Sequence, residues 1–275
     1  AVDNASLSDN SSNLTNCSNV CSDQSEQFGR SIVDIGCDHG ILAIALAATG
    51  SYQTVMGLEV SERALQDGAI NNQIRITNFI LKERASVNSG DNIRFGDNEV
   101  RNLSRNLQFR LSDGLKLVNH GEADAICLTG MGVITMIDIL FCASTEHKGD
   151  VAEIERVGCK QVYAQPTNSR PRNLVKLYDS MATAGFQPRD ERIEYLSSRW
   201  YISVQFSKVS TSPCEVVLPG QILTKLPDQN SMTKIFMEYV QHHMNWLQCE
   251  GMKTQLSKED RRWLDFVNCQ PTLSP

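Results

Sequence analysis

The sequence predicts an α/β protein built on a doubly wound, largely parallel sheet. A short β-branched strand, Ser31–Ile35, stops at Gly36, and apolar residues then recur at helical spacing over residues 41–48. A second buried strand, Thr54–Glu59, follows that helix. Strand, tight turn and helix form the opening unit of such a sheet, which binds its ligands at the carboxyl ends of the strands.

The same alternation continues along the chain. It closes with two strands separated by Ser197, Ser198 and Arg199, which is the pattern of an antiparallel hairpin. Beyond the hairpin, Ser231 and the capping pattern of Ser257 and Asp260 each predict the start of an amphipathic helix. The further predicted strands cover 107–111, 123–128, 159–164, 190–196 and 200–206, and the predicted helices cover 61–85, 134–141 and 174–181.

The chain divides into three predicted parts. Residues 1–30 are rich in Ser, Asn and Asp and bury too little apolar surface to fold, so we expect a disordered leader. Residues 31–210 form the α/β domain, in which residues 72–106 are interpreted as an insertion. Residues 211–275 form a small C-terminal helical extension, whose apolar stripe is expected to pack on the domain.

Composition limits the class of protein. With 41% hydrophobic and 21% charged residues, the chain has the make-up of a globular protein, and no apolar run approaches the roughly 20 residues of a membrane span. Nine cysteines are scattered without paired zinc-ligand spacing, so we expect no metal site and a reducing, intracellular compartment, whether cytoplasm or organelle. Cys37 and Cys127 are expected to be packed thiols. A monomer is the favoured oligomeric state.

The turn after the first strand reads Gly36-Cys37-Asp38-His39-Gly40 and indicates which nucleotide binds there. A dinucleotide-binding turn has glycine where this chain has Asp38, and a carboxylate suits a cationic or hydroxyl-bearing ligand better than a diphosphate. S-adenosylmethionine, with an ammonium, a sulfonium and a ribose, meets that requirement. Glu59 ends the next strand, where an acidic residue holds ribose hydroxyls. Asp34 or Glu59 alone could be an ordinary strand-end carboxylate, whereas both at this spacing favour a nucleoside site.

Four motifs resemble those of the bacterial tRNA (adenine(22)-N1)-methyltransferases. Those enzymes carry Asp-Ile-Gly-Ser-Asp-His, Gly-Asp-Gly-Leu, Ala-Gly-Met-Gly-Gly and Leu-Gln-Pro-Asn. This chain has Asp34-Ile35-Gly36-Cys37-Asp38-His39, Ser112-Asp113-Gly114-Leu115, Thr129-Gly130-Met131-Gly132-Val133 and Ala164-Gln165-Pro166-Thr167. The resemblance runs from residue 31 to residue 207, with departures at Val133 and Thr167. It implies a class I, Rossmann-like, seven-stranded methyltransferase sheet, S-adenosylmethionine as cofactor and methyl transfer to N1 of an adenine in tRNA.

The chemistry and the resemblance together suggest roles for individual residues. Asp38 is expected to stabilise the positive charge that develops on the methylated adenine, with His39 orienting Asp38 or the cofactor. An equal alternative is that Asp38 only binds the amino-acid end of the cofactor. Cofactor contacts are expected from Asp34, Gly36, Cys37, Glu59, Val60, Asp113, Gly114, Thr129 and Gly130, and substrate contacts from Met131, Gly132, Gln165, Pro166, Arg170 and Arg172.

Charge is distributed unevenly along the chain, which bears on the partner. The whole chain carries −6, which does not favour indiscriminate binding to nucleic acid. Residues 156–208, however, hold nine Lys and Arg against four acids, a net charge of +5. A basic segment of this kind can steer tRNA to one face, and Arg170 and Arg172 follow a strand end directly. The alternative is that these charges are solvated surface.

Three other functions remain open. The chain could methylate another RNA, a small molecule or a protein, which salt-sensitive tRNA binding would distinguish. It could be a non-catalytic RNA-binding module, although the retained Asp34, Gly36, Glu59 and Asp113 argue against that reading. A nicotinamide oxidoreductase is disfavoured by Asp38.

Overall fold

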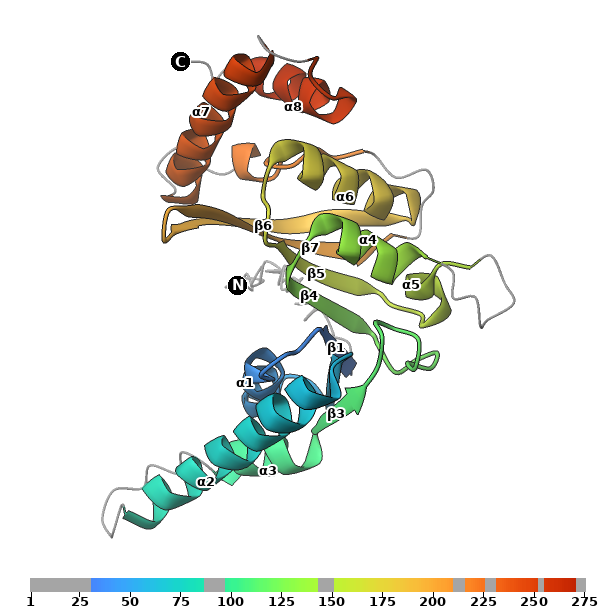
Figure 1. Ribbon diagram of the computed structural model, residues 1–275, viewed down its shortest axis with the longest axis vertical. Helices are drawn as coiled ribbons and strands as arrows, with labels where there is room; N and C mark the ends of the chain where they lie inside the picture. The colour runs from blue at the N-terminus through green and yellow to red at the C-terminus, as the bar shows by residue number, and fades with distance from the viewer. Residues whose placement is uncertain are drawn as a thin grey trace, which may run out of the picture.

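The computed structural model describes residues 31–86, 97–142, 151–209, 216–225, 231–251 and 255–270, so the predicted leader lies outside the described residues. The described chain contains a seven-stranded sheet in the order β3-β2-β1-β4-β5-β7-β6 (Figure 1). The strands are β1 (Ser31–Ile35), β2 (Thr54–Glu59), β3 (Leu107–Leu111), β4 (Ala125–Met131), β5 (Gln161–Pro166), β6 (Phe186–Leu196) and β7 (Arg199–Lys208).

The first five strands in the sheet order, β3, β2, β1, β4 and β5, are parallel to one another. Strand β7 lies between β5 and β6 and is antiparallel to both. The predicted Rossmann-like sheet with a closing hairpin is therefore confirmed. The helices are α1 (Ile41–Thr49), η1 (Ala64–Ile70), α2 (Asn71–Ser86), α3 (Asp97–Arg105), α4 (Val133–Phe141), α5 (Glu153–Arg156), α6 (Pro171–Thr183), η2 (Leu223–Lys225), α7 (Ser231–Gly251) and α8 (Lys258–Asn268).

The central strands are buried on both faces, which explains their nearly continuous apolar sequence. Every residue of β1 is buried. Ile32 belongs to a core on the α1 side, together with Ala43 and Ala47. Val33 belongs to the larger core on the other side, together with Met136 of α4. The sheet thus separates two apolar layers, and the loops at its carboxyl edge are left to carry polar groups.

The C-terminal helices pack on the domain, as their apolar stripes predict. Helix α7 contacts β6 and α8 contacts α6, and Figure 1 shows the two helices together at one end of the molecule. Trp263 of α8 is fully buried. The predicted cap is confirmed, because Ser257 Oγ accepts a hydrogen bond from the Asp260 amide at 3.0 Å. No helix of the described chain is both long and apolar enough to cross a membrane.

Several boundaries differ from the sequence prediction. Strand β4 continues to Met131 through a register shift beside Gly130, so the expected turn at residues 130–132 is partly strand. The expected hairpin turn shortens to Ser197 and Ser198, both with positive φ, because β7 already begins at Arg199. Cys127, which the sequence places near the end of its predicted strand 123–128, lies in the first half of β4. The short helices α3 and α5 were not predicted.

Candidate active site at the carboxyl edge of the sheet

The turn after β1 is held by backbone hydrogen bonds to β2. The amides of Gly36 and Cys37 both donate to Leu58 O, each at 2.9 Å. Gly36 has φ 68°, and a Cβ atom there would lie 3.1 Å from Met131 Cε. The left-handed conformation favours glycine here, and a Cβ would meet only the flexible end of the Met131 side chain. Gly36 lines a cavity at the edge where a ligand is expected.

Glu59 links this turn to the end of β2. The carboxylate is 8% exposed, and it accepts hydrogen bonds from the amides of Asp38 (3.0 Å) and Ser61 (2.9 Å). The Ser61 hydroxyl in turn accepts from the Ala64 amide at 3.2 Å, as expected for a helix cap. Each carboxylate oxygen keeps further acceptor capacity, so Glu59 is oriented by the backbone and can still accept from ligand hydroxyls.

Asp34 and Cys37 are buried behind the turn. Burial raises the pKa of Asp34 to about 7, partly offset by a hydrogen bond from the Ala43 amide. Burial also raises the pKa of the Cys37 thiol to about 12, with the charges of Asp34 and Glu59 adding to the effect. Cys127 has its pKa raised to about 12 for the same main reason. Both thiols are therefore packed and unreactive, as predicted.

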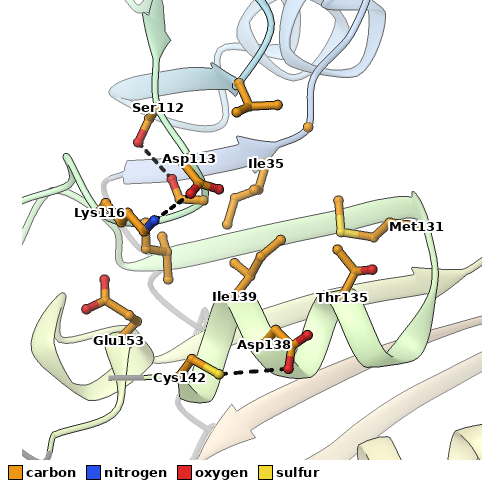
Figure 2. A pocket seen from close by; sticks show the side chains of 14 residues that line it. Ile35, Ser112, Asp113, Lys116, Met131, Thr135, Asp138, Ile139, Cys142 and Glu153 are labelled. Carbon is orange, nitrogen blue, oxygen red and sulfur yellow. Dashed lines mark hydrogen bonds and ion pairs between the residues drawn. The ribbon is translucent and has the colours of Figure 1, made fainter. Parts of the chain in front are cut away.

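Five of the predicted cofactor and substrate residues line one cavity of about 520 Å³, which is the size of a small-ligand site. They come from the ends of β1, β2 and β4 and from the loop after β3, which is the arrangement the motifs predict. Figure 2 shows this cavity between that loop and α4. These residues are Gly36, Val60, Asp113, Gly114 and Met131.

One wall of the cavity was missed by the sequence analysis. Thr135, Asp138 and Ile139 of α4 line it together with Cys142, which caps the end of the helix, and the four lie on one side of α4 (Figure 2). Their spacing of three, one and three residues is the signal that could have identified them. On the opposite wall, Lys116 Nζ lies 2.5 Å from Asp113 Oδ2 in an exposed ion pair.

The loop that carries Asp113 is held in place by Arg156 of α5. Arg156 donates to Leu115 O and Val118 O, each at 2.7 Å, and forms a largely buried ion pair with Glu153 at 2.6 Å. Arg156 belongs to the basic segment 156–208, which the sequence predicts to face RNA. In the structure Arg156 instead stabilises the loop that carries Asp113.

Asp38 and His39 lie beside the cavity rather than in it. Their side chains are 67% and 68% exposed, with Asp38 Oδ2 3.6 Å from His39 Nε2. They line a separate hollow of about 290 Å³ with Ser61 and Gly68. Asp38 is thus free to face a ligand or a substrate from solvent.

The remaining predicted residues are distributed more widely. Thr129 and Gln165 line a second cavity of about 490 Å³ together with Leu42 and Leu46 of α1, on the other side of the sheet. Gly130 and Gly132 are exposed, and Pro166 is buried. The roles of all five positions stay predictions.

Arg170 has a contact that the sequence did not reveal. Its guanidinium lies 4.8 Å from the ring centroid of Trp246 in α7, a cation–π arrangement. Next to it, Tyr239 donates to Ser169 O at 2.6 Å. The loop between β5 and α6 is therefore attached to α7. Arg172 is half-buried and forms no ion pair within the part of the chain that the structure describes.

Other cations of the basic segment are neutralised locally. Lys160 pairs with Asp124 at 2.9 Å, Arg192 with Asp190 at 3.2 Å and Lys208 with Glu155 at 3.4 Å. The +5 segment therefore offers fewer free charges than its composition suggests. Across the described ranges, no group of His, Cys, Asp and Glu has the arrangement of a metal site.

Comparison with known protein families matches part of the chain. A family model described as "Methyltransferase domain" matches residues 24–100 and 97–156. No curated protein matches the sequence.

Solved structures resemble the whole fold at low sequence identity. The B. subtilis M1A22 tRNA methyltransferase TrmK is 17% identical, with 89% of this chain and 91% of that chain covered and a TM-score of 0.51. M. capricolum TrmK, solved with S-adenosyl-homocysteine, is 16% identical over 88% of each chain, with a TM-score of 0.52. A Streptococcus agalactiae protein of the NADB-Rossmann superfamily is 20% identical, covers 90% of this chain and 91% of that chain, and has a TM-score of 0.55. At these identities the likeness shows a shared fold.

Proposed function

We propose that this chain, which has a Rossmann-like methyltransferase fold, is an S-adenosylmethionine-dependent tRNA (adenine-N1) methyltransferase. One observation carries the proposal: the five predicted residues Gly36, Val60, Asp113, Gly114 and Met131 line a single cavity. Glu59 precedes the lining residue Val60 in the chain, and the backbone orients its carboxylate. The family model and the named relatives support the reaction class and the tRNA substrate.

The residues present fit the cofactor. Glu59 would accept hydrogen bonds from the ribose hydroxyls, because the backbone already orients its carboxylate. Val60 is 65% exposed at the cavity and, with Met131, would provide apolar contact to the adenine ring. Asp113 would accept from the adenine amino group, in exchange for part of its ion pair with Lys116. Asp34 is buried behind the turn, and its contact with the cationic amino-acid end stays a prediction.

When bound, the cofactor supplies a methyl group on a positively charged sulfur. Adenine N1 has a lone pair, so no side chain has to remove a proton from it before attack. The protein therefore contributes orientation of the two reactants, and an electrostatic contribution where positive charge develops on the adenine. We expect Asp38 to make that contribution, because its carboxylate is exposed to solvent and its amide is fixed by Glu59.

The substrate is expected to approach the edge formed by Asp38 and the loop after β5. Arg172 would contact a phosphate next to the inserted base, and Arg170 would do so while resting on Trp246. We place the protein inside the cell, in a reducing compartment, and favour a monomer.

Transfer of a labelled methyl group from S-adenosylmethionine tests the substrate class. The purified protein is incubated separately with unmodified tRNA, another structured RNA of equal length, and a protein extract. Label in tRNA alone supports the proposal. Label in protein or in small molecules would favour the rival methyltransferase functions, and cofactor binding without any transfer would favour a non-catalytic RNA-binding module.

A further inference from the structure

A π-helical segment lies against the turn that carries Asp38 and His39. This segment, η1, spans Ala64–Ile70 and leads directly into α2. Such segments widen a helix locally and frequently occur at functional sites. Here Gly68 of η1 lines the same hollow as Asp38 and His39. The segment is therefore in a position to support the turn.

Gly68 makes the close approach possible. A Cβ atom at this position would lie 3.1 Å from Asp38 O, 3.1 Å from His39 Nδ1 and 3.3 Å from His39 Cα. Gly68 is not among the glycines with positive φ, so its backbone is open to any residue. The conformation of η1 does not require glycine there, whereas a Cβ atom would push the turn away by a few tenths of an ångström.

Asn72, in the first turn of α2, holds the same turn by a hydrogen bond. Its Nδ2 atom donates to His39 O at 3.0 Å. From the other side, Glu59 accepts from the Asp38 amide at 3.0 Å. Asp38 itself has φ 47°, a left-handed conformation that non-glycine residues keep only where their surroundings impose it. Contacts from both sides supply that restraint.

We propose that Gly68 and Asn72 are positioning residues, which fix the Asp38-His39 turn so that the Asp38 carboxylate faces the reacting adenine. The catalytic consequence rests on the proposed function. The positioning itself rests only on the contacts of Gly68 and Asn72 with the turn.

The test uses the full chain and three variants, Gly68→Ala, Asn72→Ala and the matched control Asn71→Ala. Asn71 is the adjacent, exposed asparagine, and no contact of its side chain with the turn is seen. Alanine is a better helix former than glycine, so a Gly68 that served only the helix would tolerate the change. Displacement of the turn by a few tenths of an ångström should instead lower kcat about tenfold in Gly68→Ala and Asn72→Ala, with KM for S-adenosylmethionine changed less than about twofold.

A second readout does not depend on the reaction. The imidazole NMR resonances of His39 should shift in Gly68→Ala and Asn72→Ala and stay in place in Asn71→Ala. Wild-type kcat or unshifted His39 resonances in the two folded variants would overturn the proposal. If the wild-type protein transfers no methyl group to tRNA, the proposed function fails, and the His39 resonances alone decide whether Gly68 and Asn72 hold the turn.

Discussion

Glu59 and Asp38 are joined by a hydrogen bond across 21 residues of sequence, with Glu59 Oε2 accepting from the Asp38 amide at 3.0 Å. The bond ties the end of β2 to the turn after β1. The residue expected to hold the cofactor ribose and the residue expected to face the adenine are thereby one unit. Changes at either residue can still be separated, because one side chain makes the bond and the other contributes only its backbone.

Replacement of Glu59 tests the cofactor site. Glu59→Ala should weaken S-adenosylmethionine binding by about 1–3 kcal/mol, since hydrogen bonds to a charged acceptor are lost. Glu59→Gln keeps one acceptor oxygen and should have an intermediate effect. Isothermal titration calorimetry with S-adenosylmethionine measures both. Wild-type affinity in a folded Glu59→Ala variant would refute the assignment.

Replacement of Asp38 separates chemistry from binding. Asp38→Asn keeps the backbone bond to Glu59 and removes the charge, so cofactor affinity should stay within about twofold while kcat falls about a hundredfold, the size of effect typical of one electrostatic contact. Single-turnover methylation and calorimetry measure the two quantities. Asp265→Asn, an exposed carboxylate of α8, is the control. A parallel loss of affinity and rate would instead make Asp38 a cofactor-binding residue.

Asp34 should make stability depend on pH. Burial raises its pKa from 3.8 to about 7 in the folded state, so the folded protein holds a proton that the unfolded chain has already released between these values. The free energy of unfolding contributed by Asp34 therefore falls as pH rises from about 4 to about 7.

Asp34→Asn removes this dependence. The difference in unfolding free energy between variant and wild type should therefore be about 2–4 kcal/mol more favourable to the variant at pH 8 than at pH 4. This range takes about 1.4 kcal/mol per pKa unit. It should also bind S-adenosylmethionine more weakly. Urea denaturation at the two pH values measures the difference. An equal difference in unfolding free energy between variant and wild type at pH 4 and pH 8 would contradict the raised pKa of Asp34.

Arg170 and Arg172 should now differ in their effects. The double variant with Arg170→Ala and Arg172→Ala should bind tRNA more weakly and bind the cofactor with unchanged affinity. Arg172→Ala alone should remove one phosphate contact, which lowers the slope of log affinity against log salt concentration by about one. Arg170→Ala should in addition lower protein stability by about 0.5–1 kcal/mol, because the contact with Trp246 is lost.

Filter binding over a salt series and thermal denaturation measure these effects. Lys176→Ala, an exposed cation one turn further along α6, is the control. A double variant with wild-type tRNA affinity and salt slope would show that the two arginines are only solvated surface.

The fold could be predicted wherever local pattern decides the structure. The end of strand β1 at Ile35 was predicted correctly, because the β-branched run of Ile32, Val33 and Ile35 is stopped by Gly36. Helix α3 was missed because it is mostly polar, and only contacts with distant elements bury its Leu103. Strand β4 was predicted too short, because its last residues pair across an irregularity at Gly130 that depends on β5.

The sequence predicted the site residues that lie in loops after the strands, but not those that lie on helices. Gly36, Asp113 and Met131 could be predicted to meet, because parallel strands end at one edge. The wall formed by α4 depends on how that helix packs against the sheet. The contact of Arg170 with Trp246 joins segments that are far apart in sequence, so no local pattern indicates it.

The most direct test of the account is the chemical identity of the methylated nucleoside. Unmodified tRNA is treated with the protein and labelled S-adenosylmethionine, digested to nucleosides and separated by liquid chromatography with mass spectrometry. The account predicts label in 1-methyladenosine, which should form about a hundredfold more slowly with Asp38→Asn. Label in N6-methyladenosine or in another base, or none in tRNA from a protein that binds the cofactor, would contradict it.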